Sequence, residues 1–365
     1  MTTMNSMQRR AILRTLLGAC ACRTVAADIH EHIRGLAANA PLEMQFEGST
    51  AEECRAWQTR FLAKLEELLG DHRPPSDWEA RLEESIEFDD HVRESLAVSA
   101  DGFPELPIHL LTPKGSFATP RPGIVALHGH GPYGNDPVAG VETTPGHIRS
   151  IRSANYDFGR QLVRKGYVVA APCLTPFGRR LDSSEAYGGT DACAVSFVRM
   201  QLLGKNLMSE NLRDARWAFE FLARRRAVDA GRIGCVGLSY GGRMTMLAAA
   251  VEPRIRVAVI SGALNVMQER IRGRYSCGAQ VIPGLLQFGD VPEIAGLIAP
   301  RPAVWEVGKR DSLMVEEWIP GAWERIRRAY KALGAEESLA MDSFDGEHRW
   351  HGAKAEPALA TALRP

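Results

Sequence analysis

The sequence predicts an α/β protein with one mainly parallel sheet of about eight strands, covered by helices on both faces and preceded by a helical extension. Two observations predict this class. Short apolar runs alternate with helix-like stretches from Gly123 onward, which is the pattern of a parallel sheet whose crossovers are helices. The 365 residues are also enough to bury one large core.

Residues 1–83 are predicted to form the helical extension. Thr50 to Glu53 is a capping box, which marks a helix start, and Gly70 marks its end. The apolar face of this helix consists of Cys54, Trp57, Phe61, Leu65, Leu68 and Leu69. Such a face must be covered, either by the main domain or by a second subunit, so a homo-oligomer through these helices is one expectation.

The first residues allow two interpretations. Arg9 to Arg14 faintly resembles a twin-arginine signal, and Cys20 lies in a weak lipoprotein-type box, which would make the protein exported or lipid-anchored. Arg14 and Arg23 interrupt the apolar stretch, however, and the apolar residues follow helical spacing. We therefore expect an amphipathic helix and a cytoplasmic protein. No run is long enough to span a membrane.

Residues 84–365 are predicted to form the main domain. Two strands are joined through Asp101 and Gly102, and an apolar strand then recurs between helices. The expected strands are Val92–Ser99, Leu106–Leu111, Gly123–Leu127, Tyr167–Ala171, Ile233–Gly237, Arg256–Ile260, Ala303–Val307 and Ser338–Phe344. Residues 263–298 form a long insertion, which is typical of a lid.

Composition excludes some classes of function. The chain carries 44 basic and 44 acidic residues, so it lacks the basic surplus of a nucleic-acid-binding protein. Seven cysteines without regular spacing do not indicate a disulfide framework. Cys193 and Cys277 are compatible with either a pocket wall or simple packing.

The segment Gly237 to Gly241 has the Gly-x-Ser-x-Gly pattern between an apolar strand and a helix. In this context the pattern predicts a nucleophile elbow, in which Ser239 sits on a sharp turn at the carboxyl edge of the sheet. The flanking glycines relieve crowding at the turn. A chance match in a loop is the alternative, and the flanking strand and helix speak against it.

A nucleophilic serine needs an acid and a base, and both are expected downstream. Asp311 lies just beyond the strand Ala303–Val307, where it would serve as the acid, as a helix N-cap, or as both. Glu306 is the rival carboxylate, although it lies inside the strand. Only two histidines follow Ser239. We expect His348 to be the base, because it follows the last strand directly, and His351 to be a surface or capping residue.

The turn His128 to Gly134 follows the strand Gly123–Leu127. A glycine-rich turn here predicts an oxyanion hole, for which the candidates are Gly129, His130 and Gly131 together with the N–H of Tyr240. A metal site at His128 and His130 is not expected, because no cysteine or carboxylate neighbour completes it. A phosphate loop is excluded because no Gly-Lys-Ser/Thr follows.

With these four elements in this order, residues 94–365 resemble the α/β-hydrolase superfamily, in its dienelactone hydrolase and acetylxylan esterase-like branch. Further segments carry the resemblance: Asp214–Leu222, Val228–Gly234, Ile282–Leu286 and Leu297–Pro302. Two positions depart from the branch. The chain has Gly346-Glu347-His348 where a second glycine is common, and Met314-Val315 where proline often follows the acid. Glu347 leaves the local pH tuning of the base open.

The resemblance implies a serine hydrolase that cleaves small to medium acyl esters, including acetylated sugars, through an acyl-enzyme and without a cofactor. Cleavage of a lactone, a peptide or a carbon–carbon bond on the same fold is the nearest alternative. A non-catalytic binding protein is the alternative from another class, and the complete set of Ser239, Asp311 and His348 disfavours it.

Overall fold

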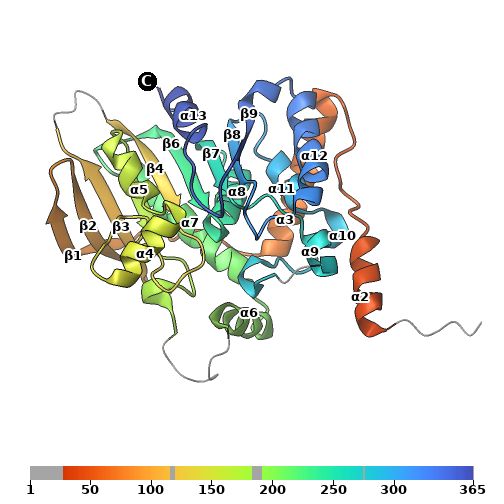
Figure 1. Ribbon diagram of the computed structural model, residues 1–365, viewed down its shortest axis with the longest axis horizontal. Coiled ribbons are helices and arrows are strands. Elements are labelled where there is room, and N and C mark those ends of the chain that lie inside the picture. The colour runs from red at the N-terminus through yellow and green to blue at the C-terminus, as the bar shows by residue number, and fades with distance from the viewer. Residues whose placement is uncertain (1–27, 116–119, 183–190, 274–275, 365) are drawn as a thin grey trace, which may run out of the picture.

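A computed structural model describes residues 28–115, 120–182, 191–273 and 276–364. Nine strands form one sheet in the order β1-β2-β3-β5-β4-β6-β7-β8-β9, which runs through the molecule in Figure 1. The strands are β1 (Glu79–Glu87), β2 (His91–Ser99), β3 (Leu106–Pro113), β4 (Arg121–Leu127), β5 (Val168–Pro172), β6 (Val228–Leu238), β7 (Ile255–Ser261), β8 (Ala303–Gly308) and β9 (Leu339–Phe344).

The strands from β5 to β9 in this order are parallel to one another. The three strands at the other side pair in antiparallel fashion, and β3 is antiparallel to β5. The predicted α/β class with a mainly parallel sheet is therefore confirmed. Because β4, β6, β8 and β9 run in one direction, the loops that follow them meet at one edge of the sheet.

Helices cover both faces of the sheet (Figure 1). The described α-helices are α2 (Ile29–Ala38), α3 (Ala51–Leu69), α4 (Pro145–Ala154), α5 (Phe158–Arg164), α6 (Ala192–Leu202), α7 (Leu207–Ala223), α8 (Tyr240–Val251), α9 (Met267–Gly273), α10 (Leu285–Phe288), α11 (Val291–Gly296), α12 (Ile319–Ala332) and α13 (Ala355–Ala362). Short 3-10 turns occupy η1 (Gly178–Arg180), η2 (Gly278–Gln280), η3 (Glu316–Trp318) and η4 (Glu336–Ser338).

Alternation of side chains along the strands produces two separate cores. In β4, Ile124 and Ala126 belong to the core under α5 and α13, whereas Val125 and Leu127 belong to the larger core under α7 and α8. Both sets are fully buried. This two-sided burial explains why the parallel strands appear in the sequence as continuous apolar runs.

The helical extension packs on the body of its own chain. The predicted capping box at Thr50 and Glu53 is present at the start of α3. The apolar face of α3, including Trp57 and Phe61, is buried in the larger core, where α3 contacts α10, α11 and α12. The α3 face is thus covered within the chain, while α2 exposes Ile29, Ile33 and Leu36. Oligomerisation through these helices stays a prediction.

One expectation about the extension was wrong. Residues 79–83 are not helical but belong to β1, which crosses the expected boundary at residue 83 and adds a ninth strand. The strand is mostly exposed and carries charged side chains at almost every second position. It therefore lacks the apolar alternation on which the prediction of strands depends, and its charges suit an edge strand that must not pair with other chains.

The remaining sequence predictions concern the first residues of the chain, the expected lid and the absence of a membrane span. The twin-arginine, lipoprotein and amphipathic-helix interpretations of residues 9–23 lie outside the described residues, so the cytoplasmic location stays a prediction. The expected lid, residues 263–298, contains α9, η2, α10 and α11, and α2 packs on α9. Within the described part of the chain, no helix is both long enough and apolar enough to cross a bilayer.

Candidate active site

Ser239 lies at the tip of a sharp turn between β6 and α8. Its backbone has φ 64° and ψ −120°, a left-handed conformation that a non-glycine residue adopts only when its surroundings enforce it. The Ser239 N–H donates to the carbonyl of Ser261 at 2.8 Å, which ties the turn to the end of β7. The predicted strand–turn–helix context of Ser239 is therefore present.

Close backbone approach explains two of the glycines around this turn. A Cβ on Gly241 would lie 1.9 Å from the carbonyl oxygen of Leu127 in β4. A Cβ on Gly129 would lie 2.8 Å from both the Leu238 carbonyl oxygen and the Ser239 Cβ. Only glycine fits at these positions, so the turn after β4 is able to lie directly against Ser239.

His348 and Asp311 form a hydrogen-bonded pair beyond the ends of β9 and β8. The distance from His348 Nδ1 to Asp311 Oδ2 is 2.6 Å. The other carboxylate oxygen accepts the Leu313 N–H at 2.9 Å, so Asp311 has both of the expected roles, as a partner of the histidine and as a turn cap. Among the described residues, the buried Nε2 of His348 has no hydrogen-bond partner, which leaves that atom available to accept a proton.

The rival residues have other partners. Glu306 is buried in β8 and accepts the N–H groups of His351 and Gly352 at 3.1 and 2.6 Å. His351 Nδ1 contacts Asp342 at 2.9 Å, and its ring stacks on Phe344. Glu306 thus holds the backbone just after His348, and the carboxylate paired with His348 is Asp311.

The turn after β4 is organised by the buried His128. Its Nε2 accepts the Leu174 N–H at 2.8 Å, so the ring proton is on Nδ1, which donates to the Gly129 carbonyl at 2.7 Å. The Gly129 carbonyl and the His130 N–H belong to the same trans peptide and point in opposite directions. Because His128 holds this carbonyl, the His130 N–H points away from the His128 ring.

One of the predicted oxyanion donors is already engaged. The Gly129 N–H donates to the hydroxyl of Tyr156 at 2.5 Å. Gly129 therefore does not offer a free donor, which corrects its expected role, and it serves the close approach of the turn to Ser239. Gly131 has φ 156°, which closes the turn. The N–H groups of His130, Gly131 and Tyr240 remain as candidate donors. Tyr156 lies far from this motif in sequence, and no sequence pattern indicated it.

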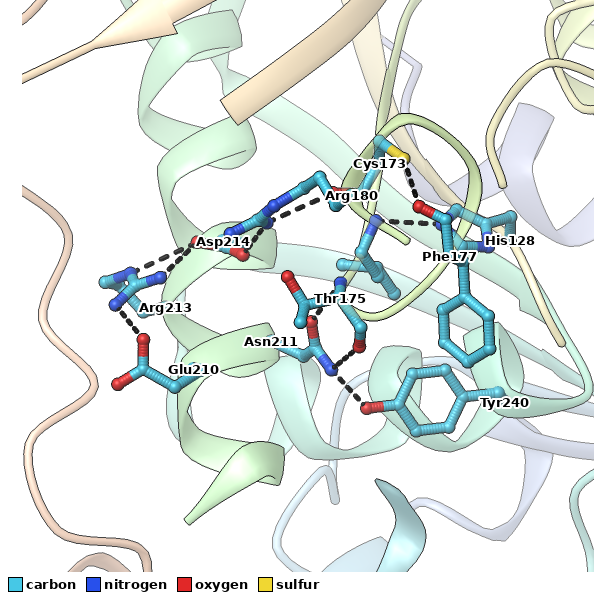
Figure 2. Close-up of polar contacts among 11 residues, drawn as sticks. His128, Cys173, Thr175, Phe177, Arg180, Glu210, Asn211, Arg213, Asp214 and Tyr240 are labelled. Carbon is cyan, nitrogen blue, oxygen red and sulfur yellow. Dashed lines mark hydrogen bonds and ion pairs between the residues drawn. The ribbon is translucent and has the colours of Figure 1, made fainter. Parts of the chain in front are cut away.

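The loop after β5 is held against α7 by hydrogen bonds of Thr175 (Figure 2). Asn211 of α7 accepts the Thr175 N–H at 2.8 Å, donates to the Thr175 carbonyl at 2.7 Å and donates to the Tyr240 hydroxyl at 2.6 Å. Arg180 forms a buried ion pair with Asp214. Because Tyr240 is held at its far end, the residue that follows Ser239 has little freedom to move.

Acid is expected to destabilise the protein through His128. Burial lowers its pKa from 6.5 to about 4. Between these values the unfolded chain binds a proton that the folded chain does not, so the free energy of unfolding falls as the pH drops from 6.5 to 4, by about 3 kcal/mol in total. Above pH 6.5 this group adds no pH dependence. Urea unfolding measured across the pH range checks this expectation.

A matched pair of variants isolates the group. His128→Asn should be less stable at neutral pH but should lose much less stability than the wild type between pH 6.5 and 4. His32 is exposed, so His32→Asn should retain the wild-type pH dependence. If His128→Asn has the same acid slope as the wild type, another group is responsible.

A cavity of about 750 Å³ lies beside Ser239 and His348. Ser239, His348, Tyr156 and His130 line it, as do three arginines, Arg243, Arg270 and Arg310. Arg243 is almost fully buried, and burial lowers its pKa to about 10, so it stays charged at neutral pH. It donates to Gln280 and Asn265, and no carboxylate of the described residues forms an ion pair with it.

The structure also brings two cysteines to His130, which the sequence argument against a metal site did not foresee. The ligand atoms of His130, Cys193 and Cys277 all lie within 4.8 Å of one another. Hydrogen bonding with Cys193 and with His130 lowers the pKa of the Cys277 thiol. These cysteines lie more than 60 residues from His130 in the chain, so sequence spacing could not reveal the cluster. Glu347 lines the cavity beside His348.

Comparison with known proteins relates this chain to hydrolases. Residues 147–271 match the model of the dienelactone hydrolase family. YtaP of Bacillus subtilis (strain 168), provisionally described as a hydrolase, is 28% identical over 292 residues, which cover 77% of this chain and 89% of YtaP.

Two solved structures share the fold. A Bacteroides fragilis protein, provisionally described as an acetyl xylan esterase, superposes with a TM-score of 0.74 at 17% identity, covering 87% of this chain and 82% of its own. A CE15 glucuronoyl esterase from Teredinibacter turnerae gives a TM-score of 0.61 at 18% identity, covering 89% of each chain. At these identities the similarity concerns the fold, which is that of the α/β-hydrolases.

Proposed function

We propose that this chain, an α/β-hydrolase similar to the dienelactone hydrolase family and thus an enzyme acting on ester bonds, uses Ser239, His348 and Asp311 as a catalytic triad. One observation carries the proposal. Ser239, in its strained backbone conformation, shares a cavity with His348, whose other ring nitrogen is held by the buried Asp311. This shared cavity and the pairing of His348 with Asp311 support the roles of nucleophile for Ser239, base for His348 and orienting acid for Asp311.

The reaction would proceed in two halves. In the first, the Ser239 Oγ attacks the ester carbonyl while His348 Nε2 takes the hydroxyl proton and then delivers it to the departing alcohol, leaving an acyl-enzyme. In the second, His348 takes a proton from water, the hydroxide attacks the acyl carbonyl, and Ser239 recovers its proton as the acid leaves. Asp311 holds the tautomer of His348 and stabilises the imidazolium.

The negative charge that develops on the carbonyl oxygen needs donors that are already in place. The backbone N–H of Tyr240 lies at the start of α8, where the helix dipole favours negative charge. The N–H of His130 is turned toward the opposite side from the carbonyl that His128 holds. We assign these two groups to the oxyanion hole, with Gly129 and Gly131 shaping the turn that presents them.

The charge of the cavity supports a narrower substrate class. Three arginines line it, against the single acidic residue Glu347. Arg310 is paired with Asp345 outside the lining, whereas Arg243 forms no ion pair within the described residues. A buried cation of this kind favours an anionic partner. We propose that preferred esters carry a carboxylate near the scissile bond. Neutral acetyl esters, including acetylated sugars, are the second candidate because of the acetyl xylan esterase among the structural neighbours.

Replacing Arg243 by methionine tests the substrate charge. The KM for an ester with a free carboxylate should rise about 10- to 100-fold, the value of a hydrogen bond to a charged group. The KM for neutral p-nitrophenyl acetate should change little, and Arg243→Lys should recover part of the preference. An equal loss on both substrates would indicate a structural role for Arg243, to be checked by thermal unfolding.

Labelling with a fluorophosphonate probe tests the nucleophile. Peptide mapping of the labelled full chain should place the adduct on Ser239, and prior incubation with an ester substrate should slow the labelling. A non-catalytic binding protein would not be labelled. A panel of ester, lactone, peptide and diketone substrates then separates the reaction classes that share this triad, and faster lactone than ester turnover would favour the lactone alternative.

A further inference from the structure

A second group of reactive side chains lies beside the candidate active site. It consists of His130 in the turn after β4, Cys193 in the first turn of α6, and Cys277 directly before η2. Their ligand atoms lie within 4.8 Å of one another. Both cysteines are buried and unbridged, while His130 is exposed and lines the cavity of Ser239 together with Cys277.

The three side chains are held in place by their surroundings. The Cys193 N–H donates to Asp191 at 3.0 Å, and the Ala279 N–H donates to Cys277 Sγ at 3.4 Å. The His130 ring lies at 5.2 and 5.3 Å from the rings of Phe177 and Tyr240. Contact between α6 and η2 brings the two cysteines together. Little rearrangement is therefore needed before a ligand can bind.

The donor set determines which ligand fits. Two thiolates and one imidazole are the donors preferred by Zn²⁺ and related soft or borderline ions, whereas Mg²⁺ and Ca²⁺ require oxygen ligands. With Zn–S bonds of about 2.3 Å and Zn–N bonds of about 2.0 Å, ligand atoms of a tetrahedral site lie roughly 3.5–3.8 Å apart. The observed spacing reaches this geometry after small side-chain movements.

We propose that His130, Cys193 and Cys277 bind one Zn²⁺ ion, with a fourth coordination position open toward the cavity of Ser239. This site is inferred from the donor set and its geometry alone, and it does not rest on the proposed ester chemistry. It places the metal on the side chain of the residue whose backbone N–H we assign to the oxyanion hole, and it links that turn to α6 and η2. A disulfide between Cys193 and Cys277 is the competing outcome, since two neighbouring thiols also suit oxidation.

Cobalt substitution of the reduced, full-length protein tests the site, because Co²⁺ replaces Zn²⁺ and its bonds to thiolate absorb light. We expect one Co²⁺ per chain, a thiolate-to-cobalt charge-transfer band, and displacement of Co²⁺ by Zn²⁺. Cys193→Ser, Cys277→Ser and His130→Ala should each weaken binding by at least about 10-fold, since even outer-shell changes cost that much. Cys54→Ala is the control. Cys54 is a buried cysteine of α3 that does not belong to the cluster, so this variant should bind metal as the wild type does.

Alkylation of the wild-type chain covers the case in which a variant fails to fold. Zn²⁺ should protect Cys193 and Cys277 from iodoacetamide in peptide maps, compared with the same chain alkylated without Zn²⁺. Three results would overturn the proposal: no bound metal in the reduced protein, metal binding unchanged in both cysteine variants, or a Cys193–Cys277 disulfide that forms in air while Zn²⁺ gives no protection. None of these readouts depends on esterase activity.

Discussion

Replacing Ser239 by alanine is expected to lower kcat for p-nitrophenyl acetate by about 10⁴-fold or more. The variant lacks the Oγ that forms the acyl-enzyme, and the remaining donors of the turn can only polarise the ester toward water. Folding should be retained, because the backbone of Ser239 keeps its hydrogen bond to Ser261. Steady-state rates of the purified variant, with thermal unfolding as a check of folding, measure this effect.

Ser343→Ala is the matched control, since Ser343 is an exposed residue of β9 and should have wild-type kinetics. If the Ser239→Ala protein hydrolyses the ester at the wild-type rate, the assignment of the nucleophile is wrong. A slow residual rate that has no burst phase is compatible with it, because catalysis by the oxyanion donors alone forms no acyl-enzyme.

Replacing Asp311 by asparagine is expected to reduce kcat by about 10⁴-fold. An asparagine of the same shape donates its amide to His348 Nδ1, so the ring proton moves to Nε2, where it blocks proton transfer from Ser239. The imidazolium also loses its neighbouring negative charge. The effect should appear in kcat rather than in KM, because Asp311 lies behind His348 and does not line the cavity. Steady-state kinetics measures both constants.

Glu306→Gln distinguishes this role from that of the other buried carboxylate. Glu306 accepts two backbone N–H groups, and the amide of glutamine can replace only one of these acceptors. We expect a loss of about 1–3 kcal/mol in the free energy of unfolding, with a much smaller drop in kcat than for Asp311→Asn. The opposite ranking of the two kcat values would make Glu306 the catalytic acid.

Most of the architecture was predictable because it depends on local signals. The apolar runs within β4, β5, β6, β7 and β8 are visible as strands, since burial on both faces leaves them few polar positions. The capping box at Thr50 specified the start of α3. The strand β1 was missed for the converse reason, because it is an exposed edge strand with a polar sequence. Its pairing partner β2 determines its conformation more than its own residues do.

In the candidate site, too, some features follow from local sequence and others only from tertiary packing. The order and spacing of Ser239, Asp311 and His348 at strand ends are properties of the sequence, because the carboxyl ends of parallel strands share one edge of the sheet. Other features of the site join segments that are far apart in the chain. Tyr156 accepts the Gly129 N–H, Arg243 lines the cavity of Ser239, and Cys193 and Cys277 approach His130. Only the packing of loops and helices around the sheet brings such segments together, and no local pattern encodes those contacts.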